Sequence, residues 1–282
     1  MQSPCGARRK GEHQELSVFR APLPPQLLLP MATFLYIFPH PDDECFGPAP
    51  MIARQRRKGH DVHLLTLTRG EATSQRERLG YSKAEMGEVR YQEMQAVAET
   101  LALTSMTVHE YPDGELAELN PLTLEDGVAA HIHETEPDVV VTYPVHGISG
   151  HPDHLVTHAV VKRVVCALRR DGVAYPKRLA FFTVPPPSDD ADRPSHLQHS
   201  PSVLIDCVVP TSPEDLSRGR EALYCYDTYR PVVEEHRPLR SVTDSTVLEL
   251  FGEHHASPLP DLIDGLDDTD TPLFSVSDPS AV

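Results

Sequence analysis

The chain has 282 residues, and its 42 acidic and 25 basic side chains give a formal net charge of −17. This acidic balance excludes nucleic acid as an expected partner, because phosphate binding needs a basic surface. An apolar fraction of 39% is enough for a core, but no run of 18 apolar residues indicates a membrane span. The five cysteines are widely spaced and form no CxxC pair. We therefore expect reduced thiols in a cytoplasmic protein.

Both ends of the chain are predicted to lie outside the folded domain. Residues 1–30 are Pro-rich near their end, and we expect a disordered extension there. Met31 comes two residues before the first strand-like run, so we expect Met31 to be the native start, with Met1 as the alternative. Residues 256–282 are acidic and contain Ser and Pro, which predicts a mobile tail. We expect one folded domain between them, over residues 31–255.

Short apolar runs alternate with helical patterns through the middle of the chain. Strands are predicted at 33–38, 60–68, 105–111, 138–143 and 178–184, and helices at 49–59, 82–103, 122–134 and 151–172. Ser82 and Glu85 form a capping box at the start of the second helix, and residues 69–81 are expected to be a polar loop. Regular alternation of strand and helix predicts an α/β fold, Rossmann-like, with three α/β/α layers and a mostly parallel sheet.

Polar clusters follow the first four predicted strands. They read "PHPDDE", "RGE", "YPDGE" and "YPVHGISGHPDH" in chain order. In open parallel sheets, ligands bind in the crevice outside the carboxyl ends of the strands. We therefore expect these four clusters to line one cleft.

Two of these clusters have the composition of a metal site. His40 and Asp43 are three residues apart on a strand-to-helix turn, and His154 follows a later strand. A catalytic zinc commonly has three His or carboxylate ligands and leaves one position for water. Asp42, between the first two, is a candidate for taking a proton from that water.

Spacing alone leaves other readings open. His151 and His158 flank His154 on the same predicted helix, so a different pair could bind the metal. Either Asp42 or Asp43 is also consistent with a helix N-cap, and a single surface histidine is usually just solvated. The metal reading is favoured because two compact His/Asp clusters fall at two strand ends that face one cleft.

"PHPDDE" and "GHPDH", in this order, resemble the zinc-dependent N-deacetylases of the PIG-L/LmbE family over about 33–170. That family includes de-N-acetylases of N-acetylglucosaminyl-phosphatidylinositol and of the sugar intermediates of mycothiol and bacillithiol. The resemblance implies one Zn²⁺ per chain, with the matching ligands His40, Asp43 and His154. It implies three catalytic roles: a general base, Asp42; a general acid or oxyanion stabiliser, His151; and a residue that orients this histidine, Asp153.

Two further segments resemble substrate-binding parts of the family. "GEVRYQEM" matches the helix whose arginine contacts sugar hydroxyls, here Arg90, and "YPDGEL" matches the segment of a sugar-binding aspartate, here Asp113. The alternatives are a surface ion pair between Arg90 and Glu93 and a plain Pro-Asp-Gly turn. Where some relatives have an oxyanion-stabilising tyrosine, this chain has Ser149, and whether Tyr143 replaces that tyrosine is open.

The resemblance implies hydrolysis of the acetyl group from the N-acetyl amine of a small molecule, an N-acetylglucosamine-type sugar conjugate. The alternatives are a zinc amidohydrolase acting on a non-acetyl amide, and a family member that binds sugars without turnover. A Rossmann-like nucleotide binder is disfavoured, because no GxGxxG follows the first strand. Relatives are often trimers or hexamers, so a homo-oligomer is a further expectation.

Overall fold

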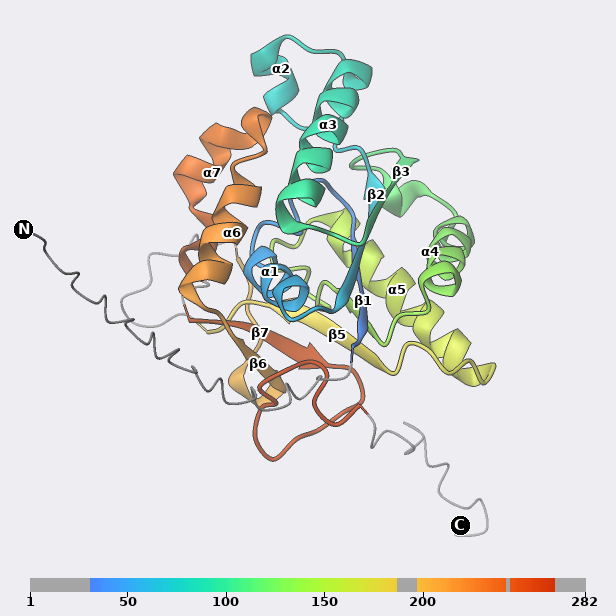
Figure 1. The fold of residues 1–282 in the computed structure, drawn as a ribbon. Helices are drawn as coiled ribbons and strands as arrows, with labels where there is room; N and C mark the ends of the chain where they lie inside the picture. The colour runs from blue at the N-terminus through green and yellow to red at the C-terminus, as the bar shows by residue number, and fades with distance from the viewer. Residues whose placement is uncertain (1–30, 187–196, 242–243, 267–282) are drawn as a thin grey trace, which may run out of the picture. The chain divides into compact units, whose positions relative to one another are not determined.

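The computed structural model describes residues 31–186, 197–241 and 244–266 (Figure 1). Its strands form one sheet in the order β3-β2-β1-β4-β5-β7-β6. The strands are β1 Thr33–Phe38, β2 Asp61–Thr68, β3 Ser105–Tyr111, β4 Val139–Thr142, β5 Arg178–Thr183, β6 Cys207–Pro210 and β7 Ser245–Leu250. The helices are α1 Ala49–Arg57, α2 Gln75–Leu79, α3 Lys83–Leu101, α4 Pro121–Thr135, α5 Pro152–Arg170, α6 Pro213–Leu223 and α7 Arg230–His236. None of the described helices is long and apolar enough to span a membrane.

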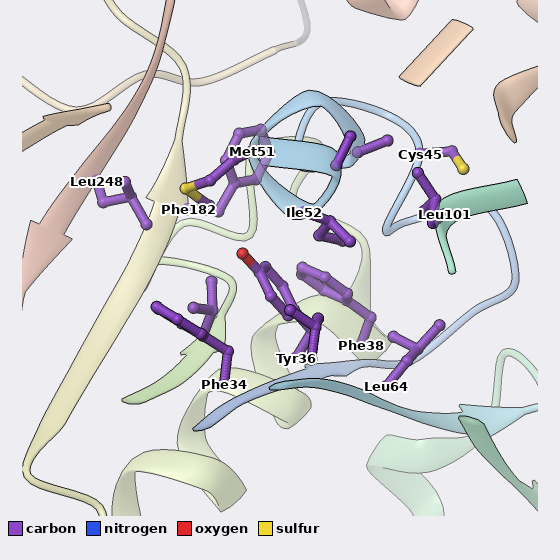
Figure 2. Packing of buried hydrophobic residues seen from close by; sticks show 14 of the residues in the cluster. Phe34, Tyr36, Phe38, Cys45, Met51, Ile52, Leu64, Leu101, Phe182 and Leu248 are labelled. Carbon is purple, nitrogen blue, oxygen red and sulfur yellow. The ribbon is translucent and has the colours of Figure 1, made fainter. Parts of the chain in front are cut away.

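The sheet separates two hydrophobic cores, and the central strand β1 contributes to both. Phe34, Tyr36 and Phe38 pack with α1, α3 and α6 on one face, and Figure 2 shows these rings beneath α1. Leu35 and Ile37 pack with α4 and α5 on the other face. All five side chains are fully buried, as the period-two alternation of a strand between two helical layers requires. The predicted three-layer α/β fold is confirmed.

The order of the strands places two predicted clusters side by side. β1 pairs in parallel with β2 on one side and with β4 on the other. The chain runs outward from β1 through β2 to β3, then returns to add β4 and β5 on the opposite side. The carboxyl ends of β1 and β4 therefore flank the point at which the strand order reverses, where a ligand crevice forms in this class of sheet.

The predicted helix starts agree with the observed caps. The Ser82 side chain accepts from the backbone N–H of Glu85 at the start of α3, and Glu85 completes the capping box. Pro152 occupies the first turn of α5, and the side chain of His151 accepts from the backbone N–H of Asp153. The HPDH cluster is thus the first turn of a helix.

Two sequence predictions need correction. The polar loop at 69–81 contains the short helix α2, Gln75–Leu79. The tail predicted from residue 256 begins too early, because residues 256–266 pack on the domain. Asp261 accepts from Arg54 of α1 and from Lys58 just after it, and Leu262 is fully buried. The predictions for residues 1–30 and 267–282 lie outside the described residues.

The second half of the described chain completes the sheet. β7 pairs antiparallel with both β5 and β6, while α6 covers α1 and α3 on one face. The sequence patterns predicted β5 but not β6, β7 or α6. β6 has only four residues and ends at Pro210, so the strand is too short for an alternating hydrophobic pattern to be recognised.

Candidate metal centre

A tight turn after β1 directs two adjacent aspartates to different partners. Asp42 has a positive φ of 86°, a conformation that Asp tolerates better than most residues. Its carbonyl accepts from the N–H groups of Cys45 and Phe46, which closes the turn. The Asp43 carboxylate folds back and accepts from the backbone N–H of His40 at 2.9 Å. The hydrogen bonds inside this turn therefore fix the orientation of Asp43 relative to His40.

Asp43 links the first cluster to the second. Its Oδ2 lies 3.5 Å from His40 Nδ1, and its Oδ1 lies 3.4 Å from His154 Nε2. Tyr143 donates to the same Oδ1 at 2.6 Å. Burial raises the pKa of Asp43, but its contacts with both histidines and the tyrosine lower that pKa to about 2. Asp43 is therefore ionised in the folded protein.

His154 presents a lone pair to this carboxylate. Its Nδ1 lies 2.9 Å from the carbonyl oxygen of Gly147, which can only accept, so Nδ1 carries a proton. Burial lowers the pKa of His154 despite the nearby charge of Asp43, so the imidazole is neutral and its Nε2 is unprotonated. Two electron-rich atoms then face each other at 3.4 Å. This arrangement suits a cation bound between them, as in metal sites where the second imidazole nitrogen donates to a carbonyl.

His40 is surrounded by carboxylates. Its Nε2 lies 3.1 Å from Asp153 Oδ2 and 3.2 Å from Asp113 Oδ1. Burial lowers the pKa of His40, but hydrogen bonds to Asp153 and Asp43, and the charge of Asp113, raise it to about 10. A group that binds a proton this strongly sits where negative potential is concentrated, and a metal ion would compete with that proton.

Two groups of side chains in the described part of the chain offer ligand atoms within 4.8 Å of one another. One is His40, His151 and His154, and the other is His40, Asp113 and Asp153. The predicted ligands His40 and His154 belong to the first group, while Asp43 contacts both of them. Imidazoles and carboxylates are the usual ligands of a catalytic zinc and also suit other divalent transition metals. The donor set thus fits a divalent ion without fixing its identity.

Arg90 is buried beside the candidate base. It is 1% exposed, and its Nη2 donates to Asp42 Oδ2 at 2.6 Å and to the carbonyl of Pro41 at 2.7 Å. The ring of Tyr229 stacks over the guanidinium at 4.1 Å. Arg90 is therefore positioned to hold Asp42, and its contact with sugar hydroxyls stays a prediction. The alternative of a surface ion pair with Glu93 is wrong, since both side chains are buried and the Glu93 carboxylate accepts from Thr228.

The pairing with Arg90 affects the candidate base. Burial raises the pKa of Asp42 to about 7, although the positive charge of Arg90 opposes the rise. A carboxylate with a pKa close to neutral is suited to exchange a proton near pH 7.

The carboxylate of Asp153 contacts His40 rather than His151. It accepts from the N–H groups of Gly114 and Leu116 and lies against His40, and the contact with the His151 ring comes from the backbone N–H of Asp153. The reason is local: Asp153 lies fully buried in the first turn of α5. His151 is exposed, and its Nδ1 accepts from the Asp153 backbone N–H.

Asp113 reaches the site from the loop after β3. One of its oxygens faces His40, and the other accepts from the backbone N–H of Ala72 at 2.7 Å. Glu71 accepts from the backbone N–H of Asp113 in return. Hydrogen bonds thus connect the strand-end clusters "RGE" and "YPDGE" beside His40, as expected for strand ends at one edge of the sheet.

Sequence reasoning left Tyr143 undecided, and the structure places it between two predicted metal ligands. Its hydroxyl contacts Asp43, and its ring stacks on His154 at a centroid distance of 4.1 Å. Ser149 lies 3.3 Å from His154 Nδ1. His158 turns away to the backbone carbonyl of Tyr143 and is not in the cluster. A signal existed, because Tyr143 follows directly on the strand that leads to the second cluster.

The sequence of this domain matches a known protein family. Residues 35–165 match the family model described as "PIG-L: GlcNAc-PI de-N-acetylase". This part of the chain is therefore a PIG-L family domain, as the resemblance of its motifs predicted.

Among curated relatives, the chain is similar to a 1D-myo-inositol 2-acetamido-2-deoxy-alpha-D-glucopyranoside deacetylase of Kineococcus radiotolerans. The two are 29% identical over 165 residues, which cover 49% of this chain and 46% of the relative. A probable N-acetylglucosaminyl-phosphatidylinositol de-N-acetylase of Schizosaccharomyces pombe is 27% identical over 146 residues, 49% of this chain and 54% of the relative. The chain thus matches about half the length of these relatives.

Solved structures share the fold. The teicoplanin deacetylase Orf2 superposes with a TM-score of 0.58 at 17% identity and covers 77% of this chain and 97% of its own. The 4-carboxy-2-hydroxymuconate hydratase GalB of Pseudomonas putida KT2440 superposes with a TM-score of 0.61 at 16% identity. The match covers 81% of this chain and 100% of GalB. Since a deacetylase and a hydratase share this fold, the fold alone does not define the reaction.

Proposed function

We propose that this chain is a metal-dependent N-deacetylase that removes the acetyl group from an N-acetylglucosamine-type sugar conjugate. Homologues of the family domain are deacetylases of GlcNAc-containing substrates. The observation that carries the proposal is the contact of Asp43 with both His40 and His154. It joins the two sequence clusters into one site inside the segment that matches the family.

His40, Asp43 and His154 would hold one divalent ion, and we expect Zn²⁺. When bound, such an ion supplies Lewis acidity, which makes water a nucleophile near pH ~7 and polarises the acetyl carbonyl. The lone pair of His154 and the ionised Asp43 support this assignment. The excess of carboxylates around His40 supports it further.

Asp42 is the proposed general base. It would accept the proton of the attacking water, and its pKa of about 7 places it between proton acceptor and proton donor at neutral pH. Arg90 fixes the orientation of the carboxylate and limits the rise of its pKa.

His151 was predicted to be a general acid or an oxyanion stabiliser, and its contacts favour the second role. Because its Nδ1 accepts from a backbone N–H, the neutral ring carries its proton on Nε2. From that atom it would donate a hydrogen bond to the developing oxyanion. An amide nitrogen leaves poorly unless it is protonated, and Asp42 would return to it the proton that it takes from the attacking water.

An amine-release assay tests the proposal. Metal-stripped protein is reconstituted with Zn²⁺ and assayed on N-acetylglucosamine, on its α-linked myo-inositol conjugate and on the matching N-propionyl compounds. We expect free amine and acetate from an acetylated sugar only after metal is added, and none from Asp42→Asn. Release from the N-propionyl compounds alone would favour the amidohydrolase alternative. If metal-loaded protein released no amine from the panel, the proposed function would be refuted.

A further inference from the structure

Tyr143 contacts two proposed metal ligands, Asp43 from the first cluster and His154 from the second. It follows β4 directly, is 4% exposed, and donates its hydroxyl proton to Asp43 Oδ1 at 2.6 Å. The ionised carboxylate has no proton to give, so the tyrosine is the donor. A hydrogen bond to a charged acceptor at this distance is among the stronger kinds in proteins.

The same side chain also supports His154. The two rings are stacked, with centroids 4.1 Å apart and planes 9° apart. Phe38 of β1 packs edge-on against the tyrosine ring at 5.1 Å, which fixes it from the sheet. The His154 ring is held at its other edge by the Gly147 carbonyl. Neither the tyrosine nor the histidine can therefore rotate alone.

The backbone of Tyr143 is anchored as well. Its carbonyl accepts from His158 Nδ1 at 2.9 Å, one helical turn beyond His154 on α5. The end of β4 and the first turns of α5 are thus joined at two levels, through the stacked rings and through this hydrogen bond. The tyrosine sits in a rigid frame rather than on a mobile loop.

We propose that Tyr143 is a positioning residue that sets the metal affinity of the site by holding Asp43 and His154 in the geometry of ligands. The inference rests on the proposed function, because it assumes that these two residues bind a metal. With Oδ2 of Asp43 occupied by the backbone N–H of His40, the tyrosine fixes the other oxygen beside His154 Nε2. Outer partners of metal ligands typically contribute 10–100-fold to metal affinity, because they remove rotational freedom from the ligands.

The test is zinc affinity, measured by competition with a chromophoric chelator on metal-stripped protein. Tyr143→Phe removes only the hydroxyl, and we expect the affinity to fall roughly 10–100-fold. Tyr143→Leu also removes the stacked ring and should weaken binding further. The matched control is Tyr36→Phe. Tyr36 is a fully buried tyrosine of β1 whose hydroxyl donates to Gln55 at 2.7 Å, away from the metal cluster. This control should bind zinc within about twofold of the wild type, since no ligand contacts it.

The melting temperatures of the metal-stripped variants separate positioning from folding. Tyr143→Phe and Tyr36→Phe each lose one buried hydroxyl and should both stay folded at the temperature of the zinc assay, so a difference in their zinc affinities reports positioning and not unfolding. Zinc affinity of Tyr143→Phe equal to that of the wild type, or an equal loss in both variants, would overturn the inference. A wild-type protein that binds no zinc would overturn the metal assignment and the inference together. Zinc binding without amine release would refute only the proposed deacetylation.

Discussion

The metal-stripped protein is expected to lose stability as the pH rises from 6.5 to 10, and the cause is His40. Its pKa in the folded protein is about 10, because hydrogen bonds to Asp153 and Asp43 outweigh the effect of burial. In the unfolded chain the pKa returns to about 6.5. Between these values the folded state keeps a proton that the unfolded state has lost. The stabilisation is therefore complete below pH 6.5 and disappears as the pH passes the folded pKa.

The size of this effect follows from the two pKa values. A difference of about 3.5 units corresponds to at most ~5 kcal/mol, at 1.36 kcal/mol per unit. This is a large part of the ~5–15 kcal/mol by which a typical domain is stable. Asp42 contributes in the same direction at lower pH. Its folded pKa of about 7 lies above the ordinary value of 3.8, so the folded state holds the extra proton between these two values.

Urea unfolding of chelator-treated protein between pH 6 and 10 measures this dependence. The variant His40→Gln should flatten the curve, while His133→Gln, which removes an exposed histidine of α4, should leave its slope unchanged. Zinc should restore stability most strongly at high pH, where no proton competes for the ring. If the curves of the wild type and His40→Gln were parallel from pH 6.5 to 10, the carboxylates would not act on His40 as the distances imply.

Three further predictions concern neighbouring residues. Asp42→Asn should keep its zinc, measured by metal analysis, but lose about 10²–10⁴-fold in kcat, as expected for a missing general base; near-normal turnover would contradict that role. Arg90→Met should cost about 3–5 kcal/mol in urea unfolding, because a buried Asp42 loses its partner. Arg163→Met, at an exposed pair with Glu125, should cost under ~1 kcal/mol, and equal costs would argue against the buried pair. Asp261→Asn should cost about 1–3 kcal/mol and speed proteolytic cleavage within residues 256–266, whereas unchanged cleavage would mean that this segment is held by other contacts.

The positions of the strand ends were predictable, because they depend on local patterns. Continuous apolar runs identify strands between two helical layers, and the carboxyl ends of parallel strands meet at one edge. The clusters at His40 and His154 could therefore be assigned to one edge of the sheet before the fold was known. The order β2-β1-β4 then makes these two ends immediate neighbours.

The partners of individual charged side chains were less predictable. Arg90 lies on the same helix face as the buried Met86 and Met94, whereas the resemblance assigned it to contact sugar hydroxyls. Its partner Asp42 is 48 residues away in sequence. Asp153 likewise bonds groups 37 and 39 residues distant. Such pairs depend on loop geometry, which spacing does not encode.

The carboxylates around His40 carry more negative charge than one bound proton can neutralise. Asp43, Asp113 and Asp153 all lie within 3.5 Å of its ring nitrogens, and a protonated imidazole offsets only one of these three charges. A divalent ion in place of that proton adds a second positive charge, where the surrounding protein screens poorly. Any added positive charge also lowers the pKa of the adjacent Asp42 and keeps it ionised at neutral pH. Arg90 acts on the same carboxylate in the same direction, so loss of the metal and loss of Arg90 should both raise the protonated fraction of Asp42 at neutral pH.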